Sequence, residues 1–249
     1  MAYSSSPVVV TWLLLLLLSL VSSSSALNCT IVDGVVTSST SSALLNKNVG
    51  VTSSSLMAFI TANYPTTYIN PVPSLVTPSN LNYLTLRGAY SADVPLVLPS
   101  FFFLVLQGAS LTAIPSFVPA NNQVSPEVSK LAVVVADSTV MNGVLGVGPR
   151  DGNVIDCADV PNGAGAFDPT TGSTSIGPPG IYFYKTSNNV VDSITVNDCG
   201  YGNGNIFVHA ANYVEIANSA ILKGRTRGVW MLTPSMSVVH HCEVSFSGK

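Results

Sequence analysis

Short apolar runs that each end in a turn-forming residue recur along this 249-residue chain from about residue 80 onward. The two clearest runs share the pattern Leu-x-Leu-x-Gly-Ala and lie 20 residues apart, at Leu84–Ala89 and Leu104–Ala109. Later runs keep a β-branched residue, a turn-former and a small residue. The turn-formers of the whole series are Gly88, Gly108, Asp137, Asp156, Asp198, Asn218 and His241. A repeat of about 20 residues predicts an array of stacked coils, each with three short strands and three turns.

The spacing of these turn-formers indicates where the coils carry insertions. Successive gaps are 20, 29, 19, 42, 20 and 23 residues. The gap of 29 contains an extra loop, Pro115–Lys130, and the gap of 42 fits either two coils or one coil interrupted by Pro161–Gly180. We favour the interrupted coil, because Pro169–Pro179 has almost no strand character.

The turn-former position holds Gly, Asp, Asn or His, which are the residues that best tolerate a left-handed backbone. We therefore expect a single column of sharp corners, in which residues such as Gly108 and Asn218 line a common edge. The flanking Leu, Val and Ile side chains would then point into one continuous core. No helical periodicity is present from residue 80 onward, so the pattern predicts a solenoid of short strands.

Residues 27–80 are rich in Ser and Thr and poorly periodic, and they form a predicted cap ahead of the coils at 81–249. Within the cap, the apolar run Leu56–Ala62 predicts a short helix that is stopped by Pro65. Such a cap would prevent edge-to-edge pairing at the open end of a solenoid. The sequence stops at Lys249 directly after a predicted strand, which predicts C-terminal truncation or, alternatively, end-to-end self-association.

The N-terminal segment has the shape of a targeting signal. An apolar run, Pro7–Val21, is followed by Ser22–Ser25 and Ala26. The run is too short for a comfortable membrane span, so residues 1–26 are a predicted secretory signal peptide that is cleaved after Ala26. Because no Lys or Arg precedes the run, an uncleaved anchor is the open alternative. Cleavage would leave a secreted, extracellular protein without stable membrane insertion.

Charge patterning narrows the classes of partner. Only 8% of the residues are charged, with 9 basic residues against 12 acidic ones. Neither a basic face nor a nucleic-acid-binding motif is present, so nucleic acid is excluded as a partner. Surface polarity comes instead from Ser, Thr and Asn, which fits a secreted protein with a neutral exterior.

The four cysteines all lie beyond the signal segment, at Cys29, Cys157, Cys199 and Cys242. In an oxidising compartment this even number permits disulfides, and the sequence leaves the three pairings, or free buried cysteines, open. Cys157 and Cys199 could form a disulfide if they occupy neighbouring coils, whereas two coils of separation between Cys199 and Cys242 would be too far. Asn28 lies in the glycosylation sequon Asn-Cys-Thr, and a glycan there would compete with bridging by Cys29.

The coil length, the Asn/Asp corners and the stacked apolar strands resemble the right-handed parallel β-helix of the pectin lyase-like superfamily. Ser91–Ser100 is similar to the entry coils of many such proteins. Gly152–Cys157 resembles the Gly-x-Ile-Asp-Gly strand of polygalacturonase-type hydrolases, with Cys157 in place of the final Gly. The resemblance covers about residues 80–249. It implies an all-β fold, a single-stranded right-handed parallel β-helix with a short N-terminal cap helix.

This resemblance implies a fold more than an activity, because the superfamily includes lyases, hydrolases, epimerases, adhesins and inert wall proteins. The catalytic aspartates and the Gly-His-Gly motif of the hydrolase branch are not found in the sequence, so no catalytic residue is predicted. The predicted function is binding of cell-wall or extracellular acidic polysaccharide, with degradation by lyase or hydrolase chemistry as its enzymatic form. The alternative is a non-catalytic structural or adhesion module.

Two charged clusters are candidate ligand sites. Lys223, Arg225 and Arg227 form a cationic loop that could hold uronate carboxylates, with a solvated turn as the alternative. A second cluster provides oxygen ligands that could bind Ca²⁺, with turn and cap roles as the alternative. The oxygen ligands of that second cluster would come from Asp151, Asp156 and Asp159.

Histidines and tyrosines supply weaker candidates. His240 and His241 could act as acid and base or as metal ligands, although strand alternation predicts that they lie on opposite faces. His209 lies inside an apolar strand and is expected to be a hydrogen-bonded core residue. Tyr182 and Tyr184, with Tyr201, could supply a sugar-stacking surface if they face outward.

Overall fold

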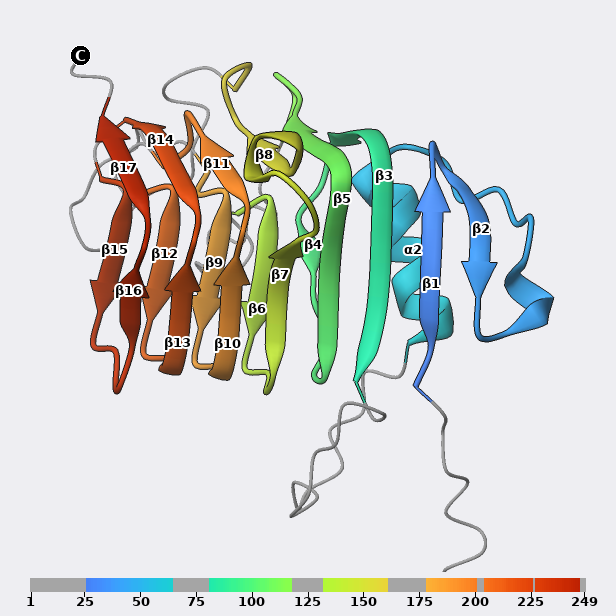
Figure 1. The fold of residues 1–249 in the computed structure, drawn as a ribbon, viewed down its shortest axis with the longest axis horizontal. Helices are drawn as coiled ribbons and strands as arrows, with labels where there is room; N and C mark the ends of the chain where they lie inside the picture. The colour runs from blue at the N-terminus through green and yellow to red at the C-terminus, as the bar shows by residue number, and fades with distance from the viewer. Residues whose placement is uncertain are drawn as a thin grey trace, which may run out of the picture.

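The computed structural model describes residues 26–64, 81–117, 132–160, 178–200, 204–225 and 227–246. These residues wind into a parallel β-helix whose coils stack along the long axis of the molecule (Figure 1). Apart from the β1–β2 hairpin, every pairing between the described strands is parallel. The predicted fold class is confirmed.

Two sheets form the walls of the solenoid. Sheet A has 12 strands, and sheet B has five, in the order β15-β12-β9-β6-β4. The strands of sheet B are β4 (Leu96–Val97), β6 (Val134–Asp137), β9 (Ile181–Tyr184), β12 (Ile206–His209) and β15 (Val229–Leu232). Each of these strands is followed by strands of sheet A, so one coil visits both walls.

Sheet A bends so that it provides two of the three sides of each coil. Its first side contains β7 (Asn142–Gly146), β10 (Ser187–Asp192), β13 (Asn212–Ala217) and β16 (Val238–His240). Its second side contains β8 (Val154–Asp156), β11 (Thr195–Asn197), β14 (Ala220–Gly224) and β17 (Glu243–Phe246). The long strands β3 (Asn82–Ala92) and β5 (Phe102–Ala113) run across the bend, and β5 pairs with both β7 and β8.

The bend in sheet A forms the edge of the solenoid that the sequence predicts Gly108 and Asn218 to share. Gly108 lies between the β5 residues that pair with β7 and those that pair with β8. Asn218 lies between β13 and β14, one coil beyond Ser193 and one coil before His241, and all three have φ between 50° and 56°. The shared edge is therefore confirmed for these residues.

The prediction of a single corner column is wrong for Asp137, Asp156 and Asp198. Asp137 ends a strand of sheet B, whereas Asp156 ends β8 and Asp198 follows β11 on the second side of sheet A. Each coil has three corners, and left-handed residues occur at all of them, for example Lys185 after β9 and Lys223 in β14. Of the three aspartates only Asp198 has the expected left-handed backbone (φ 50°), and after Asp137 it is the next residue, Ser138, that has it (φ 53°). The local pattern therefore indicates a turn but not which of the three corners it forms.

The long gap between turn-formers is a single interrupted coil, as predicted. Asn197 of β11 pairs directly with Asp156 of β8, so no complete coil lies between these strands. The proposed insertions at 115–130 and 161–180 fall mostly outside the described residues.

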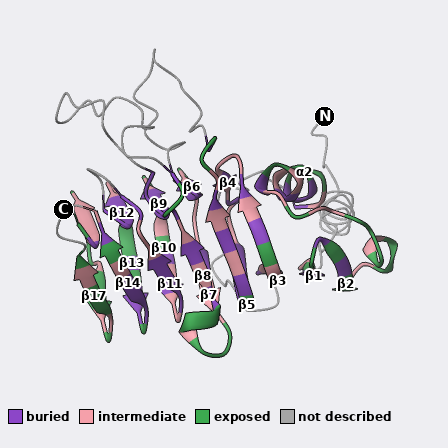
Figure 2. Ribbon diagram, turned by 90° about the horizontal axis from the view of Figure 1, so that it is seen from above, coloured by how far each residue is buried: buried purple, intermediate pink, exposed green. Residues whose placement is uncertain are grey.

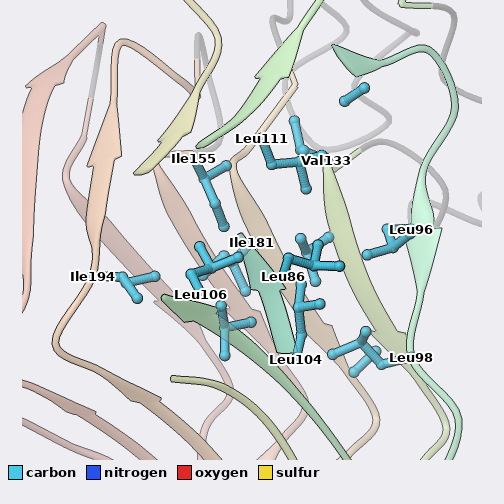
Figure 3. Packing of buried hydrophobic residues seen from close by; sticks show 14 of the residues in the cluster. Leu86, Leu96, Leu98, Leu104, Leu106, Leu111, Val133, Ile155, Ile181 and Ile194 are labelled. Atoms are coloured by element: carbon cyan, nitrogen blue, oxygen red, sulfur yellow. The ribbon is translucent and has the colours of Figure 1, made fainter. Parts of the chain in front are cut away.

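The core is one continuous apolar column inside the coils. Leu86 of β3 lies beside Leu104 and Leu106 of β5 on the next coil, with Ile155 and Ile181 from the later coils (Figure 3). All five are fully buried. In Figure 2, β9 and β12 are largely buried, whereas β17 is largely exposed. Stacking of like residues makes the core a one-dimensional array, in which each coil depends on its neighbours.

The N-terminal cap has two parts. β1 (Asn28–Val32) and β2 (Val35–Ser39) form an antiparallel hairpin, and β1 extends sheet A by pairing with β3. The helix α2 (Ser53–Asn63) buries Leu56 and Ile60, and Met57 Sδ accepts a hydrogen bond from Val97 N at the edge of β4 (3.1 Å). The helix thus covers the edge of sheet B, and the predicted short helix is confirmed. Two short 3-10 turns, η1 (Ser42–Leu44) and η4 (Arg150–Gly152), complete the described elements.

The start of α2 is fixed by its side chains. Thr52 caps the helix by accepting from Ser55 N, and the Ser55 hydroxyl completes the capping box by interacting with the backbone of Thr52. Asp93, from the loop after β3, accepts from Ser54 N (2.9 Å) and from the hydroxyls of Ser53 and Ser54. Although partial burial opposes it, these hydrogen bonds lower the pKa of Asp93.

The last described coil presents apolar side chains to solvent. Met236, Val238, Val244 and Phe246 are exposed, the most open being Met236 at 72%. Self-association through this end stays a prediction. The predicted signal peptide lies outside the described residues except for Ala26. Among the described helices, none has the length and apolarity to cross a bilayer.

Candidate functional site

Arg225, the centre of the predicted cationic loop, makes internal contacts. Its Nε donates to Asp198 Oδ1 (2.9 Å), Nη1 donates to Val160 O (2.9 Å), and Nη2 donates to Cys157 O (3.0 Å). The side chain is only 10% exposed. Arg225 therefore joins the turn after β14 to the segment after β8, where it donates to two backbone carbonyls.

The other two cations of the loop have different partners. The guanidinium carbon of Arg227 lies 4.2 Å from the centre of the Trp230 ring, a cation–π contact on the outer face of sheet B. Lys223 is exposed in β14, and its backbone N–H donates to Ser245 Oγ (3.2 Å). Substrate binding by this loop stays a prediction, but Arg225 contributes chiefly to the scaffold.

The disulfide between Cys157 and Cys199 is present, with a Cα–Cα distance of 4.9 Å. It joins neighbouring coils, which is the arrangement that a bridge between these two cysteines requires. Cys29 and Cys242 are free, and Cys29 is buried. Asn28 of the predicted glycosylation sequon is exposed at the start of β1, where its Oδ1 accepts from Tyr83 N (3.2 Å).

The predicted Ca²⁺ ligands are not brought together. Asp156 Oδ1 accepts from Asn197 Nδ2 (3.0 Å) and from Ala158 N (3.1 Å), which are turn and ladder contacts. Asp151 and Asp159 are exposed. Across the described ranges, no three His, Cys, Asp or Glu side chains cluster as a metal site would require.

An aromatic ladder runs along the outer face of sheet B. Tyr182, Phe207 and Trp230 pair in register, and each neighbouring pair of rings stacks at 4.7 Å between centroids. Because ring faces pack on one another along the solenoid axis, they are not presented to a sugar. Tyr182 is fully buried, and burial, with the nearby Tyr184 and Asp137, raises the pKa of its hydroxyl. The ladder is thus part of the scaffold, and Tyr201 lies outside the described residues.

A hydroxyl-lined cavity of about 320 Å³ lies beside this ladder, at the corner that follows sheet B. Three successive coils contribute to it, after β6, β9 and β12. Its polar lining comes from Ser138, Thr139, Lys185, Thr186, Ser187 and Asn212. A second cavity, of about 430 Å³, lies between the N-terminal hairpin and the end of α2, and no charged side chain lines it.

Two buried polar atoms in the coils that form the first cavity lack protein partners. Thr139 Oγ1 and Asn189 Oδ1 are both buried without a hydrogen-bond partner. Asn189 Nδ2 donates to Thr186 Oγ1 (2.7 Å), so the Thr186 hydroxyl is free to donate elsewhere. An unpaired buried polar atom costs about 1–3 kcal/mol. The hydroxyl and amide groups that line the cavity favour an occupant that both donates and accepts hydrogen bonds.

The rim of the cavity carries the titratable groups of this region. Lys185 Nζ lies 4.9 Å from the centre of the Tyr184 ring, and Asp137 Oδ1 accepts from Ser138 Oγ (2.9 Å). His209 Nδ1 lies 3.3 Å from the Tyr182 hydroxyl. Partial burial, with the charge of Lys185, lowers the pKa of His209, so its imidazole is neutral near pH 7. Lys185 is thus the cationic group of the rim at that pH.

Sequence reasoning missed this cavity. Its signal is a pair of hydroxyl residues after each of two strands of sheet B, Ser138–Thr139 and Thr186–Ser187. The pairs become neighbours only through the register in which Val140 bridges Ser187 and Ser187 pairs with Asn212. Ser and Thr are common along the chain, so without the register the pairs do not stand out.

Comparison with protein-family models, with curated proteins and with solved structures gives no match to this chain. The class that the structure itself defines is the parallel β-helix, with a disulfide between neighbouring coils.

Proposed function

We propose that this protein is a secreted member of the pectin lyase-like superfamily that binds cell-wall or extracellular acidic polysaccharide. The observation that carries the proposal is the cavity lined by Ser138, Thr139, Thr186, Ser187 and Asn212. Hydroxyl and amide groups both donate and accept, which matches the hydroxyls of a sugar. The disulfide fits an oxidising, extracytoplasmic compartment.

Lys185 supports an acidic rather than a neutral sugar. It lies on the lining of the cavity, and its ammonium group is a donor suited to a uronate carboxylate. The cavity crosses three coils, whose strands are about 4.8 Å apart. An extended chain lying along the solenoid axis would therefore meet hydroxyl groups on the first two of these coils and the amide of Asn212 on the third.

Binding without cleavage is the form of the function that the geometry supports best. Asp156, at the end of β8, and Asp198, directly after β11 on the neighbouring coil, accept hydrogen bonds from Asn197 and Arg225. Glycoside hydrolysis requires a pair of carboxyl groups that flank the scissile bond. Two aspartates that serve as ladder and ion-pair partners are poorly suited to that work.

A structural or adhesion module is the second candidate, and the aromatic ladder favours it. Rings that stack on one another along the axis stiffen the solenoid, and they present no face to a ligand. In that case the cavity would hold only water, and soluble polysaccharide would not bind.

Calorimetric titration with oligogalacturonate and with a neutral oligosaccharide separates the two candidates. We expect the acidic ligand to bind, and Lys185→Gln to weaken it by about tenfold, which is about 1.4 kcal/mol. Asn212→Ala should weaken both ligands, because it removes an exposed amide from the lining. Lys47→Gln, at a cation outside the cavity, is the matched control. Absence of binding by the wild-type protein would favour the structural module.

A further inference from the structure

We propose that His240 and His241 bind a divalent transition-metal ion such as Cu²⁺, with Glu215 as the residue that positions His240. The two histidines lie at the end of β16, and Glu215 lies in the neighbouring strand β13. All three are on sheet A, whereas the hydroxyl-lined cavity lies at the corner after sheet B. The site is therefore independent of the proposed polysaccharide binding.

The backbone brings the two imidazoles together. In a regular strand, His240 and His241 would lie on opposite faces, as the sequence predicts. His241 instead has φ of 53°, and this left-handed turn places its Nδ1 only 2.8 Å from Nδ1 of His240. The expectation of opposite faces is thus wrong, because the corner interrupts the alternation.

Glu215 determines which nitrogen of His240 carries the proton. Strand register pairs Glu215 with Val238 and Ala217 with His240, so the carboxylate lies diagonally across from the imidazole. Glu215 Oε1 is 2.9 Å from His240 Nε2, and a carboxylate can only accept, so Nε2 holds the hydrogen. Nδ1 of His240 then presents a lone pair toward His241. A carboxylate that holds the far nitrogen of a ligating imidazole also raises its basicity.

The distance between the two Nδ1 atoms fits one metal ion. With metal–nitrogen bonds of about 2.05 Å, a separation of 2.8 Å corresponds to an angle of roughly 85–90° at the metal. That is the angle between adjacent ligands in the tetragonal geometry of Cu²⁺. In a tetrahedral zinc site the two nitrogens would lie about 3.3 Å apart.

The pair of histidines also has room for the ion. Their side chains are on the surface: His240 is 37% exposed and Glu215 is 50% exposed. Glu215 contacts the far nitrogen of His240 and so does not face the ion, and no group of three metal-binding side chains occurs within the described part of the chain. Water would therefore complete the coordination. Before binding, Nδ1 of His241 carries the hydrogen that it donates to Nδ1 of His240. On binding, this hydrogen would move to Nε2 of His241, so two neutral imidazoles bind the ion without a net release of protons.

Titration with Cu²⁺, followed by calorimetry and electron paramagnetic resonance, tests the site. We expect one equivalent to bind with two imidazole nitrogens in the spectrum. His241→Asn, which tolerates the left-handed backbone, should weaken binding at least about tenfold and leave one nitrogen. Glu215→Gln should weaken binding by about tenfold but keep both nitrogens, as expected of a positioning residue rather than a ligand.

His209→Gln, which removes the remaining histidine of the chain, is the matched control and should leave the affinity unchanged. Circular dichroism of each variant confirms folding, and His240→Gln provides a second variant that removes the other ligand. Equal affinity in the wild-type protein, His241→Asn and His240→Gln would overturn the proposal, as would a wild-type protein that binds no Cu²⁺.

Discussion

Replacement of Arg225 by alanine should destabilise the fold, because its guanidinium joins three segments of the chain. The side chain bonds the Asp198 carboxylate and two carbonyls after β8, and it is 10% exposed. Removal of one partner of a buried ion pair costs about 3–5 kcal/mol. The Asp198 side chain is 27% exposed, so solvent screens part of that cost. We expect a loss of about 2–4 kcal/mol in the free energy of unfolding.

Urea unfolding followed by tryptophan fluorescence measures this loss. Thermal unfolding provides a second measure. For a chain of this size, 1 kcal/mol corresponds to about 2–4 °C in the thermal midpoint, so the thermal midpoint should fall by about 4–16 °C. Arg225→Lys keeps the charge but not the planar fork, and it should recover only part of the loss. Arg227→Ala, which removes an exposed cation–π contact, should cost about 0.5–1 kcal/mol.

The outcome also separates a scaffold role from a ligand role. Should Arg225→Ala unfold within about 0.5 kcal/mol of the wild-type protein, as surface substitutions usually do, the internal network of Arg225 would be refuted. The predicted uronate contact would then become the better explanation of its place in the sequence.

Three further predictions concern stability. The double variant Cys157→Ser with Cys199→Ser should lose about 4 kcal/mol in urea unfolding, because the bridge closes a loop with a sequence separation of 42; an unchanged midpoint would contradict this. Asp93→Asn should cost about 1–2 kcal/mol at pH 7. The lowered pKa of Asp93 means that this difference disappears as the pH falls below about 4, and a constant difference would argue against it. The lowered pKa of His209 means that the folded state prefers the neutral imidazole. The free energy of unfolding should therefore decrease as the pH is lowered through about 6.5, and His209→Gln should flatten that dependence.

Architecture was predictable because it rests on local patterns that repeat. The apolar alternation around Leu84–Ala89 and Leu104–Ala109 gives strands, and their spacing gives the coil length. The cap helix was predictable for the same reason, because its apolar run and its stop at Pro65 are both local. What the pattern could not provide was the identity of each corner, since Asp198 and Asn218 both have φ of 50° but lie at different corners.

The candidate sites were harder to predict because they depend on contacts between distant coils. Arg225 reaches a carbonyl 65 residues away, at Val160, and nothing beside it in the sequence indicates that partner. Thr139 and Thr186 become neighbours only through strand register. The left-handed turn at His241 was predicted from the sequence, but the contact between its Nδ1 and that of His240 required the structure.

Hydrogen–deuterium exchange with and without oligogalacturonate tests the central functional claim most directly. The account predicts slower exchange on ligand binding in the peptides that cover residues 137–142, 184–189 and 209–213, which form the cavity corner on three successive coils. Peptides of the cap and of β17 should exchange unchanged. Protection confined to residues 223–227, or spread over the second side of sheet A, would contradict the assignment of the cavity as the binding site.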